Sequence, residues 1–173
     1  MNPIPDTKTC IDLLKKAGCS KEVIDHCKAV RGVAVRIAKK AGADVKLVEA
    51  GALLHDIGRS RTHGIRHVLE GVEIAKKLGL SEKIIRIIET HVGAGIPSDE
   101  AKKLGLPGKD FIPKTLEEKI ICHADNLIEN NKRQNIEVEV EKALLKGMQS
   151  YATRLVTLHK ELSSICGIDL NKI

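Results

Sequence analysis

Apolar residues recur every three or four positions along almost the whole 173-residue chain, and this period restricts it to a helical fold. Ser20, Asp44 and Ser81 each stand just before such a stretch and predict helix N-caps, whereas Gly18 and Gly42 predict helix ends. The expected helices cover roughly 7–17, 21–41, 45–56, 67–79, 82–91, 99–104, a stretch that begins after Thr115, and 137–166. The sequence therefore predicts an all-α protein, a bundle of about six to eight helices with a long C-terminal helix.

The last expected helix, 137–166, places apolar residues at alternating spacings of four and three. They are Leu144, Met148, Tyr151, Leu155, Leu158, Leu162 and Ile165. This stripe either packs the helix along the core of its own chain or forms the seam of a homodimer, so a monomer and a homodimer both stay open. Residues 92–114 form one long irregular stretch, and loops of this length often serve as lids or rims. No internal repeat or second domain is visible, so residues 1–173 are predicted to form a single domain.

The composition is that of a globular protein, with 42% hydrophobic and 30% charged residues. Aromatic residues are nearly absent, which disfavours single-strand nucleic-acid binding, because that usually needs rings for base stacking. The net charge of +6 favours anionic partners, or reflects only a lysine-rich solvated surface. Nucleic acid is therefore a possible partner but not the favoured one.

The cysteines and the apolar segments indicate where such a protein resides. The five cysteines are odd in number and contain no C-x-x-C pair, which indicates reduced thiols rather than disulfides or a thiolate zinc site. The N-terminus lacks the apolar run of a signal peptide, and no stretch reaches bilayer length. We expect a cytoplasmic protein with no membrane partner.

The segment from Ala52 to Arg59 reads A-L-L-H-D-I-G-R and places His55 and Asp56 directly behind an apolar run. Burying an imidazole and a carboxylate together is costly unless something compensates them, and a divalent cation would do so. Adjacent helical positions point about 100° apart, so the pair can face one target only where the helix ends, as Gly58 indicates.

Further metal ligands are available on the apolar stripes of other expected helices. His26 and Asp125 lie on such stripes, and His67 and His91 supply more imidazoles. A single histidine on an apolar face is usually a core residue, but a buried carboxylate such as Asp125 is rare without a partner. Imidazoles combined with carboxylates suit Mn, Fe, Co, Ni, Zn or Mg, and their number allows one or two divalent metal ions.

These residues give the chain a resemblance to a known family. His26, His55-Asp56 and Asp125, with the segments A-L-L-H-D-I-G and H-A-D-N-L, resemble the HD-domain metal-dependent phosphohydrolase superfamily over about residues 20–130, its metal-binding core. With His67 and His91 the pattern is similar to the six-ligand subgroup, which includes HD-GYP phosphodiesterases and HD-class diadenosine tetraphosphate hydrolases. The resemblance implies that His26, His55, Asp56 and Asp125 hold one metal, and that Asp56 bridges to a second held by His67 and His91.

The resemblance also implies a reaction. It is the hydrolysis of a phosphate ester or phosphoanhydride of a small phosphorylated substrate, a nucleotide, by attack of a metal-activated water. Asp56 and Arg59 would be catalytic, and Arg59, His63 and Arg66 would bind substrate phosphate, although each of the last three also suits a solvated loop. No G-Y-P follows His91, and Arg59 replaces the usual lysine, so the chain looks more like stand-alone HD proteins. The alternative is a non-catalytic regulatory module that binds metal and nucleotide.

Overall fold

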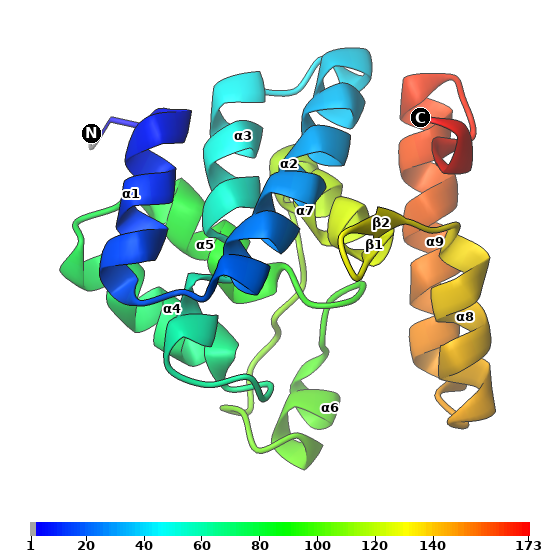
Figure 1. Cartoon of the computed structure of the whole chain (residues 1–173). Coiled ribbons are helices and arrows are strands. Elements are labelled where there is room, and N and C mark those ends of the chain that lie inside the picture. The colour runs from blue at the N-terminus through cyan, green and yellow to red at the C-terminus, as the bar shows by residue number, and fades with distance from the viewer. Residues whose placement is uncertain (1–2) are drawn as a thin grey trace.

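The computed structural model describes residues 3–173, and these residues are almost entirely helical (Figure 1). The α-helices are α1 (Thr7–Ala17), α2 (Lys21–Ala41), α3 (Val45–Leu54), α4 (His67–Lys77), α5 (Glu82–Thr90), α6 (Ser98–Lys103), α7 (Leu116–Asn126), α8 (Ile136–Leu145) and α9 (Gln149–Cys166). Two 3-10 turns, η1 (Ile57–Ser60) and η2 (Leu170–Lys172), and two short strands, β1 (Ile128–Glu129) and β2 (Lys132–Arg133), complete the described chain. The predicted all-α class is confirmed.

Short polar side chains set the starts of the helices where the sequence predicts them. Ser20 Oγ accepts a hydrogen bond from the Val23 backbone N–H, and Ser81, Asp44 and Thr115 cap α5, α3 and α7 in the same way. These caps fix where each helix begins, and therefore which of its residues face the core.

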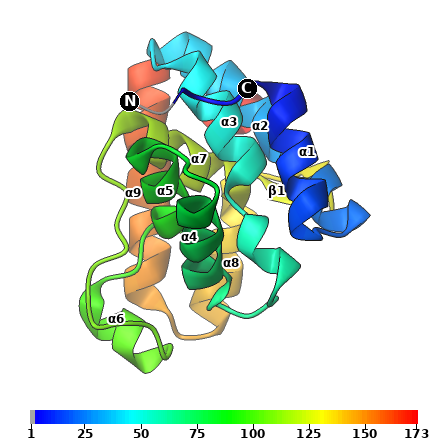
Figure 2. The same cartoon turned by 90° about the vertical axis from the view of Figure 1, so that its left-hand side faces the viewer.

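The core is built from aliphatic side chains of α2, α3, α5 and α7, with α1 and α9 packed outside. Its largest fully buried members include Ile37, Leu53, Ile87 and Ile121. Figure 2 shows α4 and α5 side by side in front of this core, and both views place α6 at one end of the molecule. Among residues 3–173 no helix is both long and apolar enough to cross a bilayer, and all five cysteines are free thiols.

The prediction of one continuous last helix is wrong. Gly147, with a φ of 70°, breaks it, and α8 and α9 run side by side as a helical hairpin. A left-handed residue cannot continue an α-helix, and glycine adopts that conformation without steric cost. Leu155 and Leu162 of the predicted stripe are fully buried, where α9 meets α2 and α7, but Leu144 is 45% exposed. The homodimer seam stays a prediction.

A small β-hairpin, which the sequence did not predict, follows the end of α7 at Asn126. Glu129 pairs with Lys132, which leaves Asn130 and Asn131 as a two-residue loop. Their φ angles of 48° and 62° are both positive, as a type I′ turn requires. Asparagine tolerates this conformation better than most residues, so the Asn-Asn pair ends the helical pattern here.

Helices α2 and α3 are joined by an ion pair. Arg31 of α2 donates an Nε–H hydrogen bond of 2.8 Å to Glu49 of α3, and this bond holds the pKa of Glu49 below its ordinary value of 4.5. Because the pKa of Glu49 is lower in the folded protein, the ion pair contributes to the free energy of unfolding above pH 4.5. This contribution is lost as the pH falls through the pKa that Glu49 has in the folded protein.

We expect Glu49→Gln to lower the free energy of unfolding by less than about 1 kcal/mol at pH 7, because both side chains are partly solvated. At pH 3 the free energies of unfolding of the variant and the wild type should differ by less than at pH 7. Urea unfolding at the two pH values measures this, and an equal difference at both would contradict the ion pair.

Candidate metal centre

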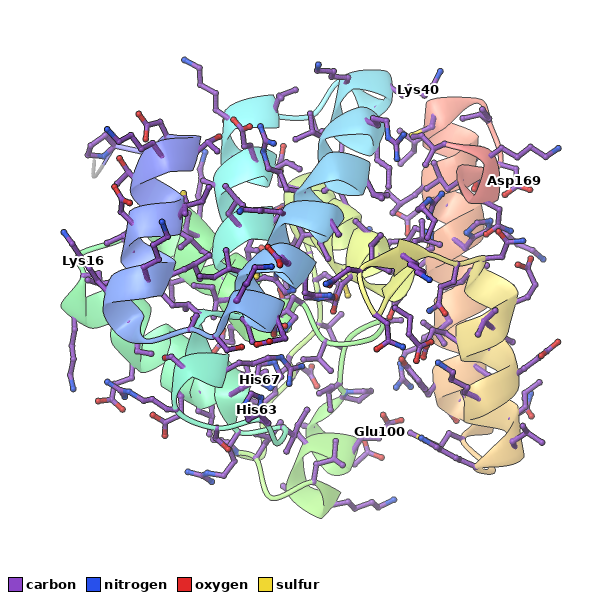
Figure 3. All side chains as sticks on the ribbon, viewed as in Figure 1. Lys16, Lys40, His63, His67, Glu100 and Asp169 are labelled. Carbon is purple, nitrogen blue, oxygen red and sulfur yellow. The ribbon has the colours of Figure 1, made fainter. Side chains whose placement is uncertain are left out.

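Six predicted ligands from five helices meet at the end of the bundle that faces α6. His26 comes from α2, His55 and Asp56 directly follow α3, and the rest come from α4, α5 and α7. Because α3 ends at Leu54, His55 and Asp56 leave the regular helical spacing and turn toward the same place. Figure 3 labels His67 and His63 at this end of the bundle.

One carboxylate oxygen of Asp56 forms a tight triangle with two imidazoles. Asp56 Oδ1 lies 3.2 Å from His67 Nε2 and 3.3 Å from His91 Nε2, and the two Nε2 atoms are 3.1 Å apart. Ligands at right angles around one ion such as Mg²⁺ or Zn²⁺, each about 2.1 Å from it, are separated by about 3 Å. The triangle therefore has the dimensions of one face of a metal coordination sphere.

The second oxygen of Asp56 faces the other three predicted ligands. Asp56 Oδ2 lies 3.6 Å from His55 Nε2 and 3.8 Å from His26 Nε2. Asp125 Oδ1 is 2.9 Å from His26 Nε2 and 3.6 Å from His55 Nε2. The two oxygens of Asp56 thus divide between two groups of side chains, each of which could hold a divalent ion.

Backbone carbonyls fix which ring nitrogen of three histidines faces inward. In each case Nδ1 bonds to the carbonyl oxygen three residues earlier, namely His55 to Ala52 at 2.7 Å, His67 to Gly64 at 2.9 Å and His91 to Ile88 at 2.8 Å. A carbonyl can only accept, so Nδ1 bears a proton, and Nε2 is the ring nitrogen that faces into the site. Histidines that ligate metals typically donate their other ring N–H to a backbone carbonyl in this way.

Burial and charge indicate that the cluster attracts a cation. His55 Nε2 and Asp56 Oδ1 are buried without a hydrogen-bond partner among the described residues. Burial alone would raise the pKa of Asp56, but His55, His67 and His91 hold it well below 3.8, so the carboxylate is ionised. Burial alone would lower the pKa of His55, but the charge of Asp56 outweighs burial and raises that pKa well above 6.5. A divalent ion would satisfy both unpartnered atoms and the negative charge.

Two glycines allow the segment after Asp56 to pack directly on α4. A Cβ atom on Gly58 would lie 1.9 Å from the His67 carbonyl oxygen and 2.5 Å from the Gly71 backbone nitrogen. A Cβ atom on Gly71 would lie 2.7 Å from an Ile88 methyl group. The backbone contact between η1 and α4 places His67 beside Asp56.

A solvent-open cavity of about 780 Å³ leads to the cluster. Its lining residues are Ser20, Glu22, Val23, His26, Asp56, Arg59, His63, Asn130 and Asn131. Arg59 Nε lies 2.7 Å from Asp56 Oδ2, and its Nη1 donates a 3.0 Å hydrogen bond to the His63 carbonyl. Arg66 is not among the lining residues, and its guanidinium instead reaches the Gly105 carbonyl at 3.4 Å.

Five residues of this cavity were not among the predicted site residues. Ser20 was considered only as a helix cap, and Glu22 and Val23 follow it in the first turn of α2. Asn130 and Asn131 enter through the unforeseen hairpin. The Asn-Asn pair is a recognisable turn signal, but nothing local in the sequence shows that this turn returns to α2.

Residues 23–130 match the model of a protein family described as "HD domain". The chain is 47% identical, over 98% of its own length, to a tRNA (cytidine(56)-2'-O)-methyltransferase from Thermoplasma volcanium, of which it covers 50%. It is 49% identical to "Uncharacterized protein MJ0778" from Methanocaldococcus jannaschii, with 85% of this chain and 91% of that protein covered. The chain thus spans about half the length of the methyltransferase relatives it matches.

Among solved structures, the HD domain of the L. monocytogenes phosphodiesterase PgpH has a similar fold. The TM-score is 0.57 at 18% sequence identity, and the match covers 91% of this chain and 95% of that one. The same domain in complex with cyclic-di-AMP gives a TM-score of 0.56. Identity this low shows the fold alone, but the match over residues 23–130 covers most of the chain and includes the whole ligand cluster. The chain belongs to the HD domain family.

Proposed function

We propose that this chain is a metal-dependent phosphohydrolase that cleaves a phosphate ester or phosphoanhydride of a nucleotide. The observation that supports this most is the division of the two Asp56 oxygens between two groups of imidazole and carboxylate ligands at the floor of an open cavity. The proposed ligands are His26, His55, Asp56, His67, His91 and Asp125, for one or two divalent ions. The name and the bound nucleotide of the PgpH neighbour support the same chemical class.

A divalent ion in this cluster supplies Lewis-acid stabilisation of a phosphoryl group and makes water acidic enough to act near neutral pH. Asp56 is ionised at neutral pH and would orient both ligand groups, which is its proposed catalytic role. Arg59, held beside Asp56 and open to the cavity, can bond phosphoryl oxygens in the transition state. His63 lines the same wall and could contact the substrate phosphate.

Arg59→Ala should lower kcat/KM by about a hundredfold, because it removes a charged donor to the transferred phosphoryl group. Arg59→Lys should recover only part of this loss, since lysine lacks the planar pair of donors. Metal content, measured by mass spectrometry of the purified protein, should stay at the wild-type level in both. The control is Arg61→Ala, because Arg61 pairs with Glu70 and Glu73 and does not line the cavity. Equal losses in Arg59→Ala and Arg61→Ala would contradict the assigned role.

The function is tested by metal analysis of the purified protein, followed by assays of nucleotides and simple phosphodiesters with Mn, Co, Ni and Mg. Turnover that requires a metal would support the proposal. Metal binding and nucleotide binding without turnover would instead support the alternative, a non-catalytic regulatory HD module.

The methyltransferase relatives favour a second candidate. They match nearly all of this chain, yet the chain accounts for only half of each, so in those proteins an HD domain accompanies other sequence. The second candidate is therefore a module that assists RNA modification rather than one that acts on free nucleotides. Salt-dependent binding of tRNA, unaffected by Asp56→Ala and without hydrolysis, would favour it.

A further inference from the structure

The charges around the cavity limit how much phosphate it can hold. Arg59 is the only lysine or arginine among the described residues that line it, and Glu22 adds a negative charge to the wall. Arg59 is already bonded to Asp56. A triphosphate would leave most of its charge without a cationic partner, since each phosphate group is best bound by its own guanidinium, ammonium or metal ion.

The Asn130–Asn131 turn forms another part of the cavity wall and offers neutral recognition groups. Both residues are exposed, and no hydrogen bond engages either side-chain amide within the described chain. The backbone on either side of the turn is fixed by hydrogen bonds. Strand β1 pairs with β2, and the Gln134 backbone N–H donates a 3.0 Å hydrogen bond to the Leu127 carbonyl. The two amides are therefore presented by a defined support and are free to bind something else.

An amide side chain presents a donor and an acceptor side by side, which matches the edge of a nucleobase. Val23, on the first turn of α2, adds an apolar surface to the same cavity, and none of its described lining residues is Phe, Tyr or Trp. The rings that line it are the imidazoles of His26 and His63, so the hydrogen-bonding groups for a base come from the asparagine turn. A volume of about 780 Å³ is ample for a mononucleotide.

We infer that the cavity binds a nucleoside bearing a single phosphate group, whose base is hydrogen-bonded by the Asn130–Asn131 turn. The position of the phosphate, at the Asp56 cluster, rests on the proposed function. The nucleotide is either free or the end of an RNA chain, since both present the same chemistry to the cavity.

The test compares two substrates with the same leaving group, bis(p-nitrophenyl) phosphate and thymidine 5′-(p-nitrophenyl phosphate). The variant is Asn130→Gly/Asn131→Gly, because glycine keeps the positive φ of the turn and removes only the amides. We expect KM for the thymidine ester to rise at least about tenfold, the loss of one good hydrogen bond, and kcat/KM for the base-free ester to be unchanged. Lys132→Ala, on the same hairpin but outside the cavity wall, is the control and should change neither.

Calorimetric binding of nucleoside 5′-monophosphates, with Mn²⁺ present, separates this inference from the proposed function. If wild-type protein turns over neither these esters nor any of the nucleotides assayed, the proposed function fails, yet the inference still requires monophosphate binding that the double glycine variant weakens about tenfold. It also requires the monophosphate to bind at least as tightly as the triphosphate. Glu22→Lys should shift that preference toward the triphosphate, whereas Glu82→Lys, in the first turn of α5, should not.

Three results would overturn the inference. They are equal losses for both esters in the double variant, no loss of monophosphate binding in that variant, and tighter wild-type binding of the triphosphate. A 5′-phosphorylated RNA oligonucleotide, assayed as a competitor, distinguishes the two sources of the nucleotide. If the oligonucleotide competes at lower concentrations than the free monophosphate does, the natural ligand is an RNA end. If the free monophosphate competes at lower concentrations than the oligonucleotide, the natural ligand is a free nucleotide.

Discussion

Asp56→Ala should abolish both metal retention and hydrolysis while leaving the helical content intact. The substitution removes an oxygen from each of the two ligand groups at once, because Oδ1 faces His67 and His91 while Oδ2 faces His26 and His55. We expect activity to fall by about 10³-fold or more, and the purified variant to contain almost no metal. Asp56 is the N-cap residue of η1 and enters its hydrogen bonding only through the backbone carbonyl, which alanine keeps, so the circular dichroism spectrum should not change.

A matched control for this variant is Asp12→Asn, because Asp12 is an exposed carboxylate on α1 that lies outside both the cluster and the cavity. It should retain wild-type metal content and activity. Asp56→Asn adds a sharper comparison, since it preserves the volume of the side chain but removes its charge. Full activity in Asp56→Ala would contradict the proposed metal centre, as would full metal content in both Asp56 variants.

The clustering of the six predicted ligands could be expected from the sequence because the pattern of helices positions their side chains. The apolar period places His26 and Asp125 on inward faces, and helix ends place His55 and His91 where α3 and α5 stop. Helical periodicity depends on residues three or four apart, so it can be read locally. The structure brings all six predicted ligands together, although their roles as metal ligands stay a prediction.

The cavity beside the cluster could not be predicted, because its walls are far apart in the sequence. Ser20 and Glu22 lie at the start of α2, and Asn131 lies on a hairpin more than 100 residues later. The division of the last helix was missed for a different reason. The apolar stripe of 137–166 continues across Gly147 with the correct spacing, so periodicity alone indicated one helix although a left-handed glycine interrupts the backbone.

The packing at Gly58 ties the stability of the fold to the geometry of the metal centre. The atoms that a Cβ at Gly58 would meet belong to the backbone of α4, which cannot move aside as a flexible side chain could. Relief of the clash requires η1 and α4 to separate. His67 is the first residue of α4 and its carbonyl oxygen is the nearest of those atoms, so any separation displaces this proposed ligand from Asp56.

Gly58→Ala should therefore lower the free energy of unfolding by about 3 kcal/mol and reduce metal content in the molecules that do fold. The control is Gly32→Ala on the exposed face of α2, where a Cβ would meet nothing within 4 Å. Alanine is the better helix former, so Gly32→Ala should raise the free energy of unfolding by about 0.5–1 kcal/mol. Urea unfolding of both variants, together with metal analysis, checks this. A Gly58→Ala protein as stable as the wild type would show that η1 and α4 are not packed backbone against backbone. If it were destabilised but kept its full metal content, His67 would not need that contact to reach Asp56.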